Sequence, residues 1–258
     1  MTRTALITGA AGGIGRAVAA RMVADGLRVA GLDLADPRLP GVTFHRADVT
    51  DPGQVRAAVR AAVDGLGGVD VLVTCAGITE GDPLHLTTDD GWRRVLSANL
   101  DSVFLCVREV LPAMMAAGSG SVVTIGSVLH RTAAPGLPAY AAAKGAIAAL
   151  TRQLAVDYGR YGISFVTLAP GWVRTPATES RLASGEGDLA RLRESNPMRT
   201  LIDVQDIAEA VAFASSPAAG ALSGSELVLD AGASVVSPAS LLRDAHRERM
   251  GLPPLDTH

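Results

Sequence analysis

The stretch TGAAGGIG, residues 8–15, lies between an apolar run, ALIT (5–8), and a segment with helical periodicity, IGRAVAARMVADG (14–26). Gly9, Gly13 and Gly15, the last two with Ile14 between them, allow a tight turn and a close approach of the backbone to a ligand. The start of the following helix favours an anion such as a pyrophosphate. The stretch therefore predicts a strand, a binding turn and a helix. A glycine-rich connection without a ligand is the alternative.

An acidic residue ends the next apolar run. Asp33 closes RVAGLD (28–33) and lies 18 residues after Gly15. This is close to the spacing of about 20 residues at which a carboxylate binds the ribose hydroxyls of a dinucleotide. Asp33 would repel a 2′-phosphate, and Gly12 offers no positive charge to offset that repulsion. We therefore expect NAD rather than NADP, with a carboxylate that only caps a turn as the alternative.

Short apolar runs alternate with longer helical segments through most of the chain. Strands that are apolar throughout and alternate with helices are typical of a parallel sheet covered on both faces. The sequence therefore predicts an α/β fold, a single doubly wound Rossmann-type domain over residues 1–236 with a parallel seven-stranded sheet, followed by a polar tail, 237–258. The link LADPRLPG (34–41) holds two prolines and should be a loop. The expected strands are 5–8, 28–33, 42–48, 69–77, 121–127, 163–170 and 226–230, and examples of the expected helices are 14–26, 52–67, 92–118 and 139–162.

Composition and charge argue against several classes of protein. The chain has 258 residues, of which 48% are hydrophobic and 19% charged, an ordinary globular balance. A net charge of −3 without a basic stripe gives no reason to expect nucleic acid. No apolar run is long enough to span a membrane, the start MTRTALITG lacks a signal-peptide pattern, and two cysteines suggest no disulfide framework. Five scattered histidines show no metal-ligand spacing. We expect a cytoplasmic protein with no metal.

The stretch YAAAK (140–144) places a tyrosine and a lysine one helical turn apart. Tyr140 and Lys144 would therefore share a face of the helix, with alanines leaving the space around them open. A tyrosine oxygen is a proton donor or acceptor, and an adjacent ammonium group favours the phenolate. On its own the pattern also fits an ordinary helix surface.

In the order in which they occur, these motifs resemble those of the classical short-chain dehydrogenase/reductase family, over about residues 3–234. The glycine motif of that family, TGxxxGxG, is matched from Thr8 to Gly15, and its serine is matched by Ser127, 13 residues before Tyr140. The remaining matches, at positions that bind cofactor or relay protons in the family, are Asp48, Val49, Ala76, Gly77, Asn99, Pro170, Gly171, Val173 and Thr175.

The resemblance implies a role for each catalytic residue. Tyr140 would exchange a proton with the substrate oxygen while a hydride moves between a carbinol carbon and nicotinamide. Lys144 would activate Tyr140 and hold the nicotinamide ribose. Ser127 would bind the substrate oxygen, and Asn99 would hold a water that relays protons. Read singly, Ser127 would be a strand-end cap and Asn99 a helix residue bonded to neighbouring backbone.

The chain departs from the family pattern after the fourth strand. Thr74 and Cys75 replace the two asparagines of NNAG, although Ala76 and Gly77 remain. We interpret Cys75 as a small buried hydrophobe rather than a reactive thiol. Val166 replaces a further structural asparagine, and LDAG (229–232) replaces VDGG. None of these changes touches the proton-transfer residues.

The substrate pocket is the part of the site that the sequence determines least. By resemblance, a variable flap over about 176–200 would bound the pocket. Polar groups such as His130, Arg174 and Arg181 would suit a sugar or polyol, whereas the apolar side chains would suit a carbocycle or a steroid-like ring. The sequence leaves both open, and a solvated loop position is the alternative for His130. The predicted pocket residues are Leu129, His130, Leu137, Pro138 and Trp172.

The predicted function is therefore an NAD-dependent oxidoreductase that acts on a small-molecule secondary alcohol or ketone. A 3-oxoacyl carrier-protein reductase and a catalytically silent dinucleotide sensor or scaffold are the alternatives. The family resemblance also implies a homotetramer, with helices at about 98–117 and 140–159 packing across one interface. In the tail, SLLRDAHRERMG (240–251) is compatible with a short helix, and the tail is predicted to pack on a neighbouring subunit near its flap. A frayed chain end is the alternative.

Overall fold

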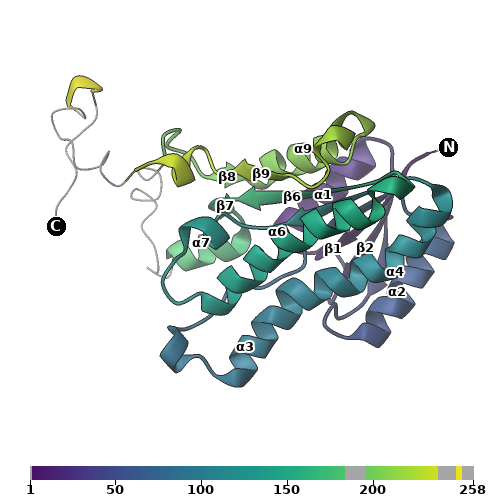
Figure 1. The fold of residues 1–258 in the computed structure, drawn as a ribbon, viewed down its shortest axis with the longest axis horizontal. Coiled ribbons are helices and arrows are strands. Elements are labelled where there is room, and N and C mark those ends of the chain that lie inside the picture. The colour runs from purple at the N-terminus through teal and green to yellow at the C-terminus, as the bar shows by residue number, and fades with distance from the viewer. Residues whose placement is uncertain (1, 184–195, 238–247, 252–258) are drawn as a thin grey trace.

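The computed structural model describes residues 2–183, 196–237 and 248–251 (Figure 1). It confirms the doubly wound α/β fold with a parallel sheet of seven strands, in the order β3-β2-β1-β4-β5-β6-β9. The sheet strands are β1 Thr4–Thr8, β2 Arg28–Asp33, β3 Val42–Arg46, β4 Val71–Thr74, β5 Gly120–Ile125, β6 Ile163–Pro170 and β9 Glu226–Leu229. A separate two-stranded sheet joins β7 (Val173–Arg174) to β8 (Ile202–Asp203).

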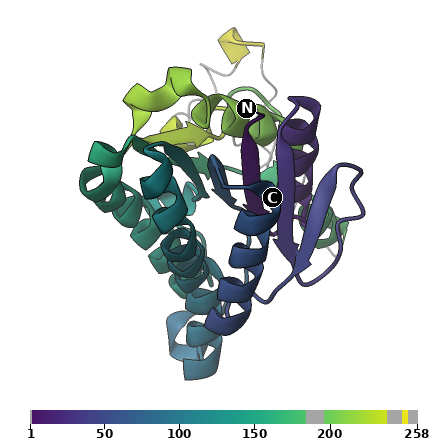
Figure 2. The ribbon, with the colours of Figure 1, turned by 90° about the vertical axis from the view of Figure 1, so that its right-hand side faces the viewer.

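Helices cover both faces of the sheet, as Figures 1 and 2 show. Successive side chains of a strand point to opposite faces, so each strand contributes to two cores. In β1, Leu6 belongs to the core under α2, α4 and α6, whereas Ile7 belongs to the core under α1 and α9. The helix bounds are α1 Gly13–Ala24, α2 Pro52–Leu66, α3 Asp89–Leu96, α4 Ser102–Ala117, α5 Leu129–Thr132, α6 Pro138–Tyr158, α7 Pro176–Ala183 and α9 Val204–Ala214.

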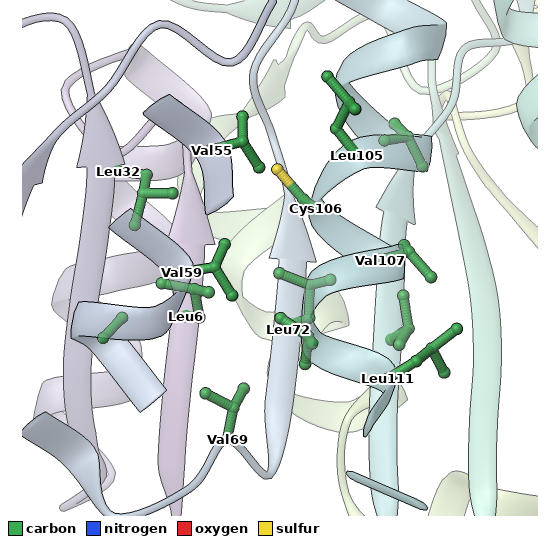
Figure 3. Close-up of a cluster of buried hydrophobic side chains, with 14 of the residues drawn as sticks. Leu6, Leu32, Val55, Val59, Val69, Leu72, Leu105, Cys106, Val107 and Leu111 are labelled. Carbon is green, nitrogen blue, oxygen red and sulfur yellow. The ribbon is translucent and has the colours of Figure 1, made fainter. Parts of the chain in front are cut away.

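The core beneath α2 and α4 fixes these helices against the middle of the sheet. Figure 3 shows Val59 of α2 and Leu111 of α4 among the side chains that cover Leu6 and Leu72. Leu6 and Leu72 are fully buried. Burying a leucine completely stabilises a fold by about 1.5–3 kcal/mol, so this cluster is a major source of stability.

Local signals explain where α2 begins and ends. The Asp51 carboxylate accepts hydrogen bonds from the amides of Gly53 and Gln54, and Pro52 occupies the first turn. The helix ends at Gly67, which has a left-handed conformation. The segment 34–41 contains no helix, as its prolines predicted.

One predicted helix is divided in the structure. The segment 92–118 was expected to be continuous, but α3 and α4 are separated by one π-helical turn, Ser97–Asp101. A π turn disturbs the regular backbone pairing of a helix, and such turns are frequent at functional sites. Here the Asn99 side chain donates a hydrogen bond to the Val95 carbonyl, four residues earlier. The apolar periodicity of the segment does not reveal this turn.

Two of the predicted segments lie partly outside the described residues. Of the predicted flap, 176–200, the structure describes α7 and residues 196–200. Of the predicted tail, 237–258, it describes residues 237 and 248–251. The predicted helix at 240–251 therefore falls mostly outside the described part of the chain.

Gly15→Ala should destabilise the protein. A Cβ atom on Gly15 would lie 2.1 Å from the Gly9 carbonyl oxygen, a backbone atom that also accepts a hydrogen bond from the Gly12 amide. We expect the free energy of unfolding to fall by about 1–3 kcal/mol or more, as measured by urea denaturation. Gly65→Ala is the matched control, because no atom lies within 4 Å of its added Cβ. It should stabilise α2 by about 0.5–1 kcal/mol. Equal effects of the two substitutions would contradict this account of the turn.

Candidate active site

The predicted site residues gather at the edge of the sheet where its parallel strands end. Ligands of open α/β sheets bind outside the carboxyl ends of the strands, because the loops that follow the strands meet there. Each of five neighbouring strands ends directly before a predicted segment. These are β1 before the glycine turn, β2 at Asp33, β4 before Ala76 and Gly77, β5 before Ser127, and β6 before Gly171.

The glycine turn fits a dinucleotide pyrophosphate. No side chain caps the start of α1, where Gly12 is the N-cap residue. Gly13 lies against Thr175, since a Cβ on Gly13 would be 3.0 Å from the Thr175 Cβ. The predicted cofactor residues on either side of the turn are therefore brought together. An uncapped helix start beside small residues suits an anion bound through backbone amides.

Asp33 is tied to this turn. Its Oδ2 accepts a hydrogen bond from the Ala11 amide at 2.9 Å, and its Oδ1 accepts one from the Ala35 amide at 3.2 Å. The bond to Ala35 is the turn cap that was the alternative for this residue. The bond to Ala11 additionally holds a negative charge beside the glycine turn. The structure thus fixes the Asp33 carboxylate beside the glycine turn.

Asp48 and Val49 lie one strand further out, after β3. The Asp48 Oδ1 accepts hydrogen bonds from the amide and the hydroxyl of Thr50, and its own amide donates to the Gln54 side chain. Val49 packs against the core beneath α2. The structure thus fixes the orientation of this loop at the start of α2.

Asn99 is buried in the π turn, with 1% of its surface exposed. Its Nδ2 donates hydrogen bonds to the carbonyls of Ile78 and Val95, each at 2.9 Å. These two bonds fix the amide plane and direct Oδ1 toward Gly77, where an added Cβ would lie 2.5 Å from that oxygen. Oδ1 has no hydrogen-bond partner among the described residues. A buried acceptor of this kind is suited to a water or a ligand.

Ser127 follows β5 and is 6% exposed. Its Oγ accepts a hydrogen bond from the Leu129 amide at 3.2 Å, and its hydrogen is free to point elsewhere. The amides on both sides of Ser127 are bonded to β6, from Gly126 to Leu168 and from Val128 to Pro170. The serine is therefore held against the sheet by its neighbours.

Tyr140 and Lys144 share one face of the first turns of α6, as YAAAK predicted. The Lys144 Nζ lies 5.5 Å from the centre of the Tyr140 ring and donates a 2.9 Å hydrogen bond to the Ile125 carbonyl at the end of β5. It also approaches Gly77, since an added Cβ there would be 3.8 Å away. Lys144 and the Asn99 oxygen thus flank the same glycine.

Burial governs the ionisation of Lys144. The side chain is 5% exposed, and removal from water lowers the pKa of its ammonium group. Tyr140 and Cys75 act in the opposite direction through their negative forms. An ammonium group that is excluded from solvent beside a tyrosine is the arrangement expected where protons are exchanged.

The composition contains a signal that motif reasoning overlooked. Lysine and arginine together number 23, and Lys144 is the one lysine in the whole chain. All the other residues in this count are arginine. Arginine stays charged in proteins, whereas lysine is a compact cation whose pKa shifts on burial.

The structure shows the surroundings of Thr74 and Cys75, which replace the two asparagines of the family pattern. Burial raises the pKa of the Cys75 thiol to about 12, with Lys144 acting against this rise. Cys75 is thus a neutral thiol at neutral pH, in agreement with its interpretation as a small hydrophobe rather than a reactive thiol, but it is partly and not fully buried. The Thr74 hydroxyl is buried without a hydrogen-bond partner in the described structure, and the Ala76 amide bonds to the Thr8 hydroxyl instead.

The segment after β6 closes the site on the other side. Gly171 lies so near Asp230 that an added Cβ would be 2.8 Å from the Asp230 Cβ. Val173 begins β7 and pairs with Ile202 of β8. The Thr175 Oγ1 accepts a hydrogen bond from the Thr178 amide at the start of α7. This strand pair connects the cofactor side of the site to the predicted flap.

The predicted pocket residues differ in their surroundings. Leu129, Leu137 and Pro138 are partly buried, and Trp172 is 47% exposed. Pro138 also lines a cavity of about 240 Å³ between the loop after β4, α3 and the start of α6. His130 is engaged elsewhere, because its Nε2 lies 3.2 Å from the Glu226 carboxylate.

The described ranges hold neither a cluster of metal ligands nor a membrane-spanning helix. No group of three or more His, Cys, Asp or Glu side chains in residues 2–183, 196–237 and 248–251 is arranged to hold a metal ion. None of the helices in those ranges combines the length and the apolar character needed to cross a membrane.

Comparison with known proteins defines the class. A family model described as enoyl-(acyl carrier protein) reductase matches residues 9–234. The chain therefore belongs to the short-chain dehydrogenase/reductase family, whose members bind a nicotinamide dinucleotide, and its reaction class is oxidoreduction at CH–OH groups.

Three relatives illustrate the range of the similarity. The 2-(R)-hydroxypropyl-CoM dehydrogenase of Xanthobacter autotrophicus is 39% identical over 89% of this chain and 98% of its own. The cis-4-hydroxycyclohexanecarboxylate dehydrogenase of Sinomonas cyclohexanicum is 37% identical over 91% and 97%. The solved structure of Thermoplasma acidophilum aldohexose dehydrogenase superposes with a TM-score of 0.87 and 29% identity, over 92% of this chain and 96% of that one.

Proposed function

We propose that this protein is an NAD-dependent dehydrogenase or reductase that acts on a secondary alcohol or ketone, with Tyr140, Lys144, Ser127 and Asn99 as its catalytic residues. The observation that carries the proposal is the placement of Lys144. The one lysine of the chain is buried beside Tyr140 and bonded to the last carbonyl of β5, next to an unpartnered Asn99 oxygen. Such an arrangement is costly to a fold and is explained by proton transfer.

In the oxidation, the Tyr140 phenolate accepts the proton of the alcohol while hydride leaves the carbinol carbon. The Ser127 hydroxyl donates a hydrogen bond to the substrate oxygen and orients it. The Lys144 ammonium stabilises the phenolate, and the burial that excludes water strengthens this attraction. The Asn99 oxygen holds a water through which Lys144 exchanges protons with solvent. In the reduction, Tyr140 returns the proton to the substrate oxygen.

The residues that would hold the dinucleotide surround these groups. A bound nicotinamide dinucleotide would supply the two-electron chemistry as hydride acceptor or donor. The glycine turn would bind its pyrophosphate, Asp33 its adenosine ribose, and Lys144 its nicotinamide ribose. The other proposed contacts are Asp48 and Val49 toward the adenine, with Ala76, Gly77, Pro170, Gly171, Val173 and Thr175 along the remainder of the cofactor.

Asp33 supports NAD over NADP. Its carboxylate is fixed beside the glycine turn by the Ala11 amide, so a 2′-phosphate on the same ribose would meet a like charge. The fold does not exclude NADP, since the related actinorhodin polyketide ketoreductase was solved with NADPH. The choice therefore depends on this side chain.

The pocket favours a small cyclic alcohol over a sugar. Of its polar candidates, His130 lies against Glu226 and Arg174 lies 3.5 Å from the Asp203 carboxylate. The other predicted pocket residues are the apolar Leu129, Leu137, Pro138 and Trp172. The hydroxycyclohexanecarboxylate dehydrogenase is a relative whose named substrate contains a cyclohexane ring.

The proposed active form is a homotetramer. Phe104 of α4 and Val156 of α6 are 49% and 79% exposed, so both helices carry apolar surface that a second subunit would cover.

Tyr140→Phe should abolish turnover. The assay is a panel of cyclohexanol, 4-hydroxycyclohexanecarboxylate, glucose and a 3-hydroxyacyl thioester with NAD⁺ and NADP⁺, followed by the absorbance of reduced nicotinamide. We expect turnover of a cyclic alcohol with NAD⁺ and a loss of about 100-fold or more in Tyr140→Phe, because the proton acceptor is removed.

Tyr158→Phe is the matched control, since Tyr158 packs against Tyr161 and Phe165. Preference for the thioester with NADP⁺ would favour the acyl carrier-protein reductase instead.

Asp33→Ala should relax cofactor choice. Loss of the carboxylate removes the ribose contact and the repulsion of a 2′-phosphate. The dissociation constant of NADPH divided by that of NADH should therefore fall by about tenfold or more. A tenfold fall corresponds to about 1.4 kcal/mol of relative binding free energy. Asp36→Ala removes a carboxylate from the same loop and should leave the ratio unchanged. Tighter binding of NADPH than of NADH by the unmodified protein would refute the assignment.

A further inference from the structure

A buried ionic cluster lies outside the proposed catalytic group. Glu226 begins the edge strand β9, and its side chain is 6% exposed. Its carboxylate lies 3.2 Å from the His130 Nε2 and 2.7 Å from the Arg131 Nη2. His130 is nearly buried as well, with 11% of its side chain exposed, whereas Arg131 is 56% exposed. The inner pair is therefore Glu226 and His130, and Arg131 covers it from outside.

The second ring nitrogen of His130 contacts the proposed active site. His130 Nδ1 is hydrogen-bonded to the main-chain carbonyl of Ser127. A carbonyl only accepts, so Nδ1 must carry the hydrogen. Nε2 then accepts a hydrogen bond from the Arg131 Nε, 3.2 Å away. The Glu226 carboxylate lies 3.2 Å from the same nitrogen and forms no hydrogen bond among the described residues, so it acts on the imidazole through its charge and close packing.

This bond completes the fixation of one peptide unit. The carbonyl of Ser127 and the amide of Val128 belong to the same planar group. The amide donates to the Pro170 carbonyl of β6 at 3.0 Å, and the carbonyl on the opposite side accepts from His130. The peptide plane between Ser127 and Val128 is therefore held from two sides. The Ser127 Oγ accepts a hydrogen bond from the Leu129 amide, so its direction depends on how this part of the backbone is held.

We propose that Glu226 and His130 are a positioning pair for Ser127. Glu226 orients the imidazole, the imidazole holds the Ser127 carbonyl, and the fixed peptide aims the serine hydroxyl at the substrate oxygen. The edge strand β9 thereby acts on a group at the end of β5, two strands away in the sheet. Only the role of Ser127 in binding the substrate oxygen rests on the function proposed above. The anchoring of the Ser127 peptide does not depend on any substrate.

Two histidine substitutions separate positioning from simple packing. The amide nitrogen of an asparagine at 130 is two bonds from Cβ, as Nδ1 is, and would reach the Ser127 carbonyl. The amide nitrogen of a glutamine is three bonds away, as Nε2 is, and would reach Glu226 instead. Positioning therefore predicts that His130→Asn rescues what His130→Ala loses and that His130→Gln does not.

Hydrogen–deuterium exchange of residues 127–130 tests the anchoring without a substrate. In His130→Ala, exchange of the Val128 and Leu129 amides should rise about tenfold or more, while amides of β5 such as Val123 stay unchanged. His130→Asn should exchange within about twofold of the unmodified protein, His130→Gln should resemble His130→Ala, and Glu226→Gln should be intermediate. Arg131→Met removes the half-exposed member and should change little. Indistinguishable exchange in the Asn and Gln variants, or no increase in the Ala variant, would overturn the proposal.

Kinetics with cyclohexanol and NAD⁺ test the consequence for the reaction. His130→Ala should lower kcat/KM for the alcohol about tenfold and leave the KM for NAD⁺ within about twofold, with rescue by Asn alone. An equal loss toward both reactants would show a general structural effect and contradict positioning. If the unmodified protein turns over no member of the alcohol panel, the proposed function has failed, and the exchange experiment still decides the anchoring.

Discussion

The structure of the site depends on one buried ammonium group. Lys144 reaches the end of β5 from α6, bonds to the Ile125 carbonyl, and has no ion-pair partner among the described residues. Keeping a charge so far from water requires that its surroundings be fixed. Gly77 leaves room on one side, Asn99 fills the space beyond it through a π turn, and Tyr140 lies over the other side. These features, from three different elements, converge on the same nitrogen.

The burial of Lys144 reduces stability wherever its ammonium group is charged. Because burial lowers the pKa of Lys144, the folded state binds its proton less tightly than the unfolded chain does. Stability is therefore greatest above the ordinary lysine value of 10.5 and falls as the pH drops through the lowered value. The loss is complete below the lowered value. A neutral side chain would avoid it, so the retained lysine fits a role in proton transfer.

Much of the fold was predictable because its signals are local. Apolar strands, the glycine turn and the proline-containing loop at 34–41 each follow from a few adjacent residues, and the seven strands appeared within a few residues of the predicted bounds. The proposed catalytic residues were predicted through spacing and resemblance, and the structure brings Tyr140, Lys144 and Asn99 close to Gly77. What the sequence did not reveal depends on contacts distant along the chain. The π turn at Asn99 involves a bond to Ile78, and His130, predicted for the pocket, is turned toward Glu226, almost a hundred residues away.

The most direct test uses the fact that the chain has one lysine. Protein labelled with lysine carrying ¹⁵N at Nζ gives one side-chain signal, so an NMR titration reports Lys144 alone. The account predicts a midpoint above neutral pH, where the ammonium must persist to stabilise the Tyr140 phenolate, but below the 10.5 of an ordinary lysine, because burial disfavours the charge. A midpoint at or above 10.5 would show that the group is not desolvated. A midpoint below 7 would leave Tyr140 without its cation, and either result would contradict the account.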